Sequence, residues 1–453
     1  MWGGRFAQPM DARLDRLNRS LPVDRRLWRE DLATNRAWVR ALARCGVLTA
    51  AEREGLLAGL GTVETALAGG AADAAADEDI HSLIERLLGE AIGPLAGKLH
   101  TGRSRNDQMG TDLRLWTMGA LDRLDAALAA LGRALIGQAE RGVDVLLPAY
   151  THTQRAQPVR FAHWALAHVW PLARDRARLH EARPRAAVLP LGSGAIAGSG
   201  FAVDRAALAA DLGFTAVSEN SMDAVGDRDF AVEAVFVAAL AGMHASRLAE
   251  DLILFSSAEF GFVRLAEPFT TGSSLMPQKR NPDSLELVRG TSGHLVGALV
   301  ALLATMKAMP TGYQKDLQEN NAALFEALDR ARDAADLLGG VVEGLVPDPA
   351  RMTAALEPSV LATDLADLLV AGGVAFREAH GLVGALVRRA EELGVPFGAV
   401  ESGEVARLDP RLPAALARLG GAEAAVERRA VAGGTARAAV LAQIRAAREA
   451  FGA

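Results

Sequence analysis

The most chemically suggestive stretch of this 453-residue chain is a polar loop at 270–282. It places the paired serines Ser273 and Ser274 close to Lys279 and Asn281, between two long apolar patterns. A serine hydroxyl beside cationic and amide donors could act as a nucleophile, or as a base whose oxyanion the donors stabilise. The loop could also do no more than cap the helix that follows it.

Two further polar segments, 97–108 and 148–158, carry similar donors. In the first, Arg105 offers a planar fork suited to bidentate binding of a carboxylate. Its arginines could instead form a solvated helix start. In the second, His152 is a candidate acid or base, or a hydrogen-bonded structural histidine. The donors are mainly arginine, lysine, asparagine, serine and threonine, a set that suits the binding of carboxylates.

Familiar catalytic templates are missing from the sequence. It has no phosphate-binding glycine loop, no HExxH, no GxSxG and no GxGxxG, and its nine histidines show no metal-ligand spacing. Lysine and tyrosine are rare in a chain rich in alanine, arginine, leucine and glycine. Most of them fall in the polar, alanine-poor segments, which we therefore take as the candidate site: Lys98, Lys279, Lys315, Tyr150 and Tyr313.

Composition limits the class of protein. Half of the residues are hydrophobic, enough for a large core, and the net charge of −6 argues against a nucleic-acid or polybasic membrane partner. The single cysteine, Cys45, cannot form an intramolecular disulfide and suits a reducing compartment. The start lacks a signal-peptide pattern, and the apolar stretch 295–306 is too short to span a bilayer. We expect a soluble, cytoplasmic protein.

Helical periodicity dominates and predicts an all-α fold. A 3-4-3-4 apolar spacing predicts a helix over about 111–142, and four further long runs resemble it, at about 159–183, 228–259, 283–309 and 319–343. Helices of this length must pack side by side as a bundle. The segment 293–303 is apolar nearly all round, so it needs partners on every side, and we infer an oligomer core.

Several motifs resemble one family. Residues 272–281 match the GSSxMPxKxN loop of the fumarase/aspartase superfamily. Within that superfamily the chain is similar to the argininosuccinate lyases, in matches that cover essentially its whole length: 2–6 (WGGRF), 99–107 (LHTGRSRND), 150–152 (YTH), 189–195 (LPLGSGA) and 362–367 (ATDLAD).

This resemblance implies β-elimination of argininosuccinate to arginine and fumarate, the last step of arginine biosynthesis, without metal or organic cofactor. It gives Ser273 the role of the base and Lys279 that of stabilising the oxyanion and the intermediate. It pairs His152 with Glu286 on the acid side, where His152 would protonate the departing nitrogen directly or through water. The elimination places a second negative charge on a carboxylate, so preorganised donors are required.

Substrate contacts follow by position from the same resemblance. Asn321 departs from it, because the family usually has a lysine there that contacts a substrate carboxylate, and this puts substrate affinity in doubt. The contacts expected here are Ser20, Asp24, Ser104, Arg105, Asn106, Thr151, Asn281, Tyr313 and Gln318.

The family architecture implies three mainly helical domains, here 1–103, 104–355 and 356–453, with five-helix bundles joined into a 20-helix core. It implies a homotetramer whose active sites each combine the three polar segments from three subunits. Two alternatives remain. One is another fumarate-releasing lyase of the superfamily, against which the run 102–107 argues. The other is a non-catalytic structural relative.

Overall fold

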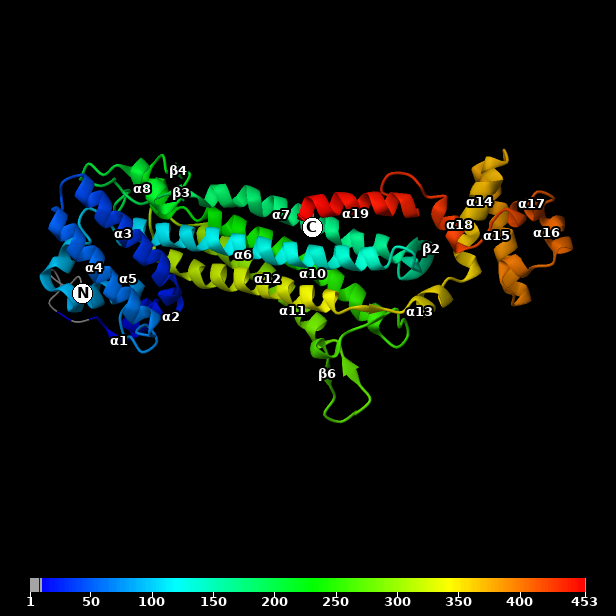
Figure 1. Ribbon diagram of the computed structural model, residues 1–453, viewed down its shortest axis with the longest axis horizontal. Helices are drawn as coiled ribbons and strands as arrows, with labels where there is room; N and C mark the ends of the chain where they lie inside the picture. Colours follow the sequence, from blue (N-terminus) through cyan, green and yellow to red (C-terminus); the bar gives the residue numbers. More distant parts are fainter. Residues whose placement is uncertain (1–7, 9, 453) are drawn as a thin grey trace. The chain divides into compact units, whose positions relative to one another are not determined.

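The computed structural model describes residues 8 and 10–452 (Figure 1). The motif at 2–6 lies outside the described residues. The described chain is predominantly helical, which confirms the all-α prediction. By its internal contacts it divides into two compact units. Unit 1 comprises Met1–Asp125, Ala177–Leu240 and Gly293–Arg332, and unit 2 comprises Ala126–Arg176, Ala241–Ser292 and Asp333–Ala453.

Five long helices form where the apolar periodicity predicted them. They are α6 (Arg105–Arg141), α7 (Phe161–Ala186), α10 (Asp229–Ser256), α11 (Asp283–Met306) and α12 (Glu319–Glu343). The apolar stripe that predicted α6 is fully buried, as expected for a core-facing helix side. Its members are Leu121, Leu124, Leu128, Leu131 and Leu135.

Unit 1 adds shorter elements at its N-terminal end. Among them α3 packs on both α4 and α5. Local sequence fixes their ends: Thr49 and Glu52 form a capping box at the start of α4, and Asp79 caps α5. The elements are α1 (Ala12–Asn18), α2 (Leu21–Asp24), η1 (Arg25–Leu27), α3 (Trp28–Arg44), α4 (Ala50–Ala68), α5 (Ile80–Ile92), η2 (Gly93–Lys98), α8 (Arg205–Leu212), α9 (Ser221–Gly226), η4 (Lys315–Gln318) and the parallel pair β3 (Val188–Leu189) and β4 (Ala216–Val217).

Unit 2 contains a β-hairpin, two short antiparallel pairs and the C-terminal helices. The strands are β1 (Leu146–Thr151), β2 (Gln154–Arg160), β5 (Val263–Arg264), β6 (Thr271–Gly272), β7 (Arg280–Asn281) and β8 (Val346–Pro347), with η3 (Glu267–Phe269) before β6. The helices are α13 (Pro349–Ala354), η5 (Pro358–Leu361), α14 (Ala362–Ala371), α15 (Phe376–Leu393), η6 (Phe397–Ala399), α16 (Ser402–Leu408), α17 (Leu412–Ala417), α18 (Ala422–Glu427) and α19 (Arg437–Phe451).

The C-terminal helices α14 to α17 enclose a hydrophobic core of their own within unit 2. Leu365, Leu369, Leu386 and Leu412 lie at its centre. A separate core of this kind is what an independent C-terminal domain requires. The division into three domains at 103/104 and 355/356 stays a prediction.

The polar segment 148–158 lies in a β-hairpin, although no strand pattern is visible there in the sequence. Strands β1 and β2 pair antiparallel from Leu146 with Arg160 to Thr151 with Gln154, with an irregularity between Pro148 and Tyr150. The polar residues of β2 do not alternate with apolar ones, so periodicity could not reveal the strand.

Two described helices, α10 and α11, are long and apolar enough to cross a membrane by length and composition. In α10, 56% of the most apolar 18-residue window is buried, as in the core helix of a soluble protein, whereas in α11 only 17% is buried. The expectation that the apolar stretch is too short was therefore wrong, because the helix around it has 24 residues. The apolar face of α11 is therefore largely exposed in a single chain.

Candidate active site

Unit 1 contains a polar cavity of about 220 Å³ that gathers residues from distant parts of the chain. Five predicted substrate contacts line it: Ser20, Arg105, Asn106, Tyr313 and Gln318. The other lining residues are Glu78, Asp79, His81, Met109, Arg228, Lys315, Leu317 and Asn321. Ser20, the neighbours Arg105 and Asn106, and the nearby Tyr313 and Gln318 lie far apart in the sequence. The fold brings them together around one cavity.

Ser20 is held on the cavity wall by a fully buried carboxylate. Its hydroxyl donates to Asp24 at 2.5 Å, and the second oxygen of Asp24 accepts the Ile80 N–H at 3.0 Å. Burial raises the pKa of Asp24 to about 6. Asp24 does not itself line the cavity in the described chain. In this chain Asp24 holds Ser20 in position, and the substrate contact predicted for Asp24 stays a prediction.

The start of α6 supplies two side chains to the wall. The Arg105 guanidinium forms an ion pair with Asp79 and donates to Ser82 Oγ at 3.0 Å. The Asn106 side-chain amide donates to the carbonyl of Ala195 at 3.2 Å. Both side chains are therefore fixed in place before any ligand arrives, which lowers the cost of binding.

The residues just before α6 make hydrogen bonds within the chain, and the substrate contact predicted for Ser104 stays a prediction. The Ser104 N–H donates to Asp107 at 2.9 Å, and Ser104 Oγ accepts the Asn106 N–H at 3.2 Å, so Ser104 caps the helix and does not line the cavity. Arg103 is only 7% exposed and donates to Asn35. The alternative interpretation of this segment as a solvated helix start is wrong.

A close backbone contact places Tyr313 at the cavity. A Cβ on Gly226 would lie 2.7 Å from the carbonyl oxygen of Gly312, so this approach requires glycine. Gly312 itself has a φ of +92°, in the left-handed region that favours glycine. Burial raises the pKa of Tyr313, so its phenol stays protonated at neutral pH and can donate a hydrogen bond.

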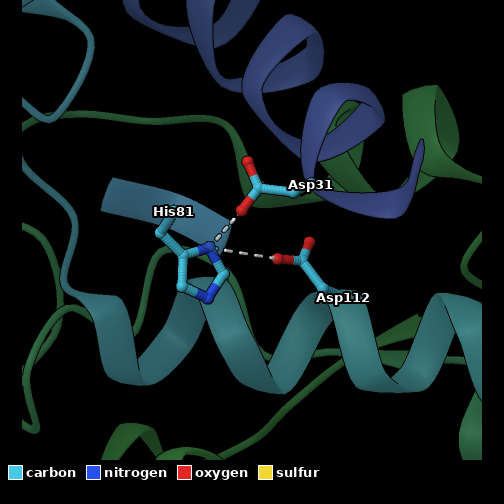
Figure 2. Close-up of side chains that lie close together, drawn as sticks. All are labelled: Asp31, His81 and Asp112. Carbon is cyan, nitrogen blue, oxygen red and sulfur yellow. Dashed lines mark hydrogen bonds and ion pairs between the residues drawn. The ribbon is translucent and has the colours of Figure 1, made fainter. Parts of the chain in front are cut away.

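One lining residue, His81, belongs to a buried network of charged side chains (Figure 2). His81 Nδ1 bonds to Asp31 and lies 3.7 Å from Asp112, and all three side chains are buried. Burial alone would lower the pKa of His81, but Asp31, Asp79 and Asp112 outweigh it and raise the pKa to about 9. Burial and the charge of Asp31 raise the pKa of Asp112 well above its usual value. At neutral pH His81 is therefore an imidazolium, whose charge outweighs the effect of burial on Asp31 and lowers the pKa of that carboxyl.

The ligand atoms of Asp31, His81 and Asp112 lie within 4.8 Å of one another, a spacing that could suit a metal ion. The sequence had shown no metal-ligand spacing. Most of their polar atoms are already engaged, however: Asp31 binds His81 and accepts from Gln108 at 2.9 Å, and Asp112 accepts from Thr34 at 2.5 Å, whereas His81 Nε2 and Asp112 Oδ2 have no hydrogen-bond partner in the described chain. A metal would also have to displace the tightly held His81 proton. The three residues therefore fit a hydrogen-bonded network better than a metal site.

The His81 network predicts that stability falls at alkaline pH. The folded chain holds this proton more tightly than the unfolded chain, so the stabilisation is complete below pH 6.5 and is lost as the pH rises through about 9. We expect the free energy of unfolding to drop by about 3 kcal/mol across this range. Urea unfolding of wild type and His81→Gln at both ends of the range measures it. An equal pH dependence in the two proteins would rule out His81 as its source.

Thr151 and His152 lie at the turn of the β1–β2 hairpin in unit 2. His152 and Thr153 have φ values of 54° and 57°, and both side chains are exposed. Left-handed backbone is costly for a β-branched residue, and such strain gathers at functional sites. The strained turn holds the His152 side chain at the surface of its unit.

Ser273 lies on the exposed loop between β6 and β7, which projects away from the helices of unit 2 (Figure 1). Its Oγ accepts the backbone N–H of Leu275 at 3.3 Å and that of Met276 at 3.0 Å. Two N–H donors directed at one oxygen stabilise negative charge there. This hydroxyl is therefore better suited than an isolated serine to act as a base.

The remaining predicted residues lie around the same loop. Lys279 is exposed and its backbone N–H donates to Met276, Asn281 pairs with Thr271 across β6 and β7, and Glu286 lies in the first turn of α11. Within the described residues of one chain, no hydrogen bond or ion pair joins Glu286 to His152. The predicted pairing of these two residues stays a prediction.

Sequence reasoning missed four charged cavity residues: Glu78, Asp79, His81 and Arg228. Arg228 stood in a polar segment, 220–229, that could have drawn attention to it. Asp79 and His81 gave no local signal, because their partners lie far away in the sequence. Conversely, Lys98 was included for its rarity, but it pairs with Glu52 and does not line the cavity.

Comparisons with known proteins agree on one family. A family model described as lyase matches residues 4–297, and one described as argininosuccinate lyase C-terminal matches residues 359–427. The argininosuccinate lyase of Roseiflexus castenholzii is 53% identical over 453 residues, covering 100% of both chains. That of Schizosaccharomyces pombe is 43% identical, covering 100% of this chain and 98% of the relative.

Solved structures share the fold. An EDDS lyase in complex with formate superposes with a TM-score of 0.84 at 31% identity, covering 94% of this chain and 86% of the other. An EDDS lyase variant with bound fumarate gives the same TM-score and coverage at 29% identity.

Proposed function

The chain belongs to the argininosuccinate lyase family, and we propose that it splits argininosuccinate into arginine and fumarate by β-elimination at a site built from its three polar segments. The observation that carries the proposal is the pair of loop N–H groups on Ser273 Oγ. This step would be the last of arginine biosynthesis, and we place it in the cytoplasm.

The elimination begins when Ser273 Oγ removes a proton from the carbon next to a substrate carboxylate. The electrons of that C–H bond become the new C=C bond, and the C–N bond to the guanidinium nitrogen breaks. Lys279 and the two loop N–H groups offset the negative charge that builds up. His152 returns a proton to the departing nitrogen, so that arginine leaves with its guanidinium group restored and fumarate remains.

The cavity of unit 1 would hold the rest of the substrate. Arg105 and Asn106 are fixed in its wall by Asp79 and by the Ala195 carbonyl, and Tyr313 offers a phenol donor. Donors preorganised in this way orient a substrate without a large entropic cost. We propose that this cavity binds one end of argininosuccinate while the Ser273 loop acts on the other.

We further propose a homotetramer with active sites shared between subunits. On α11, Val296, Val300 and Leu303 form one exposed apolar stripe at i, i+4 and i+7, and each is more than half exposed. Leu287, 67% exposed, precedes Val296 by nine residues and so faces the opposite side of the helix. A helix with apolar residues exposed on two sides suits a core made of helices from several subunits.

Purified protein should release fumarate from argininosuccinate, at the same rate with and without a chelator. Ultraviolet absorbance of fumarate measures the rate, and adenylosuccinate serves as the control substrate. Complete inhibition by the chelator would contradict cofactor-free elimination. Release from adenylosuccinate alone would favour another lyase of the superfamily, and no release from either would favour a structural protein.

A further inference from the structure

Arg228 is a buried cation on the wall of the unit 1 cavity. It directly precedes α10 and is only 1% exposed. Its Nη1 donates to the backbone carbonyl of Asp227 at 2.6 Å, whereas its Nε has no hydrogen-bond partner. Within the part of the chain that the structure describes, no carboxylate lies within ion-pair distance of this guanidinium. Burial lowers the pKa of Arg228 to about 10, which leaves it charged at neutral pH.

The neighbouring carboxylate is committed elsewhere. One oxygen of Asp227 forms an ion pair with Arg114, and the other accepts the Asp229 N–H at 2.7 Å. At longer range the charge of Asp227 favours the Arg228 cation, and that of Arg114 disfavours it. No carboxylate of the described chain forms an ion pair with Arg228.

The other cations of the cavity wall do have acidic partners. Arg105 pairs with Asp79 and His81 with Asp31. Lys315 lies 3.7 Å from Glu78. Among the described lining residues, the positive charge left over is that of Arg228.

A buried guanidinium without a carboxylate partner is expensive, and proteins pair such charges or use them to bind ligands. Arg228 opens onto a cavity, so a ligand can supply the missing anion. Asn321 in the same wall is a neutral amide whose buried Oδ1 has no partner, and it adds no positive charge. A planar fork such as Arg228 matches the two oxygens of a carboxylate.

We propose that Arg228 binds a carboxylate group of the ligand in this cavity and is a substrate-binding residue beyond those expected from the sequence. The inference rests on the proposed function for the choice of ligand. Argininosuccinate carries a carboxylate at its amino-acid end and two at its succinate end. The carboxylate that binds Arg228 could belong to either end. Small molecules that resemble only one end each can distinguish the two.

The test is the affinity of the full-length protein for three probes, measured by calorimetry: L-arginine, succinate, and agmatine, which is arginine without its carboxylate. Arg228→Gln should weaken binding of L-arginine or succinate about 10- to 100-fold and that of agmatine less than about twofold. A loss of affinity for L-arginine would place the carboxylate of the amino-acid end at Arg228. A loss of affinity for succinate would place a carboxylate of the succinate end there. An unchanged affinity for both carboxylates, or an equal loss for L-arginine and agmatine with succinate unchanged, would overturn the proposal.

Two further variants separate binding from folding. Arg205→Gln also removes an arginine of unit 1, one that donates to the backbone carbonyls of Leu191 and Leu189 and does not line the cavity. It should lower the melting temperature without changing the ratio of the L-arginine and agmatine affinities. Arg228→Lys keeps the charge and should lose less carboxylate affinity than Arg228→Gln. If Arg228→Gln does not fold, two other results together overturn the proposal. Arg228→Lys would bind the carboxylate probes as tightly as wild type, and wild type would bind them no more than tenfold (about 1.4 kcal/mol) more tightly than agmatine. These measurements need no turnover, so a protein that fails to release fumarate can still pass them.

Discussion

Ser273→Ala should lower the rate of fumarate release about 10²- to 10⁴-fold, the usual contribution of a general base. The hydroxyl that accepts the N–H groups of Leu275 and Met276 is lost, so no oxyanion can form at that point. The proton is transferred in the transition state, and we therefore expect the loss in kcat with KM changed little. Initial rates over a range of argininosuccinate concentrations measure both constants.

Ser274→Ala is the matched control for this prediction. It changes the neighbouring serine of the same exposed loop, and no loop N–H is directed at its hydroxyl in the described structure. We expect it to keep most of the wild-type rate. If Ser274→Ala were inactive and Ser273→Ala retained normal turnover, the base would be the other serine.

The long helices could be predicted from the sequence because their signal is local. The leucines from Leu121 to Leu135 repeat at helical spacing, and the packed side of α6 buries all of them. The hairpin could not be predicted in this way. Its turn uses His152 and Thr153 in left-handed conformations, where a glycine or asparagine would have given a turn signal.

The polar segments of the candidate site were visible for a different reason. In a chain dominated by alanine, arginine and leucine, residues such as Tyr313 and Lys279 stand out, and motif resemblance supplied their roles. The residues of the His81 network could not be found this way. His81 is defined by Asp31 and Asp112, which lie 50 and 31 positions away, and only the folded chain brings them together. Arg228 became informative only when the structure left its charge without a carboxylate.

The second prediction with a large expected effect on the rate concerns the sharing of active sites between subunits. His152→Asn damages the hairpin segment and Ser273→Ala damages the loop, so each protein alone should be nearly inactive. Both segments belong to unit 2, but we propose that a given active site takes them from different chains. When the two variants are unfolded together and reassembled at random, about one site in four should then receive an intact copy of each segment.

A second mixture serves as the control. It shows whether activity is recovered only when the two variants are damaged in different segments. Ser273→Ala and Lys279→Gln both damage the same loop, which one chain supplies to a given site. Their mixture should gain no activity over the parents. Differently tagged chains, separated by size and affinity, must show that mixed tetramers form in both experiments.

The specific activity of tetramers reassembled from equal amounts of His152→Asn and Ser273→Ala chains tests the central claim most directly, because it needs both the catalytic roles of these residues and their origin in different subunits. We predict about one quarter of the wild-type rate of fumarate release. Activity no higher than that of the separate parents, in tetramers shown to be mixed, would contradict the shared site.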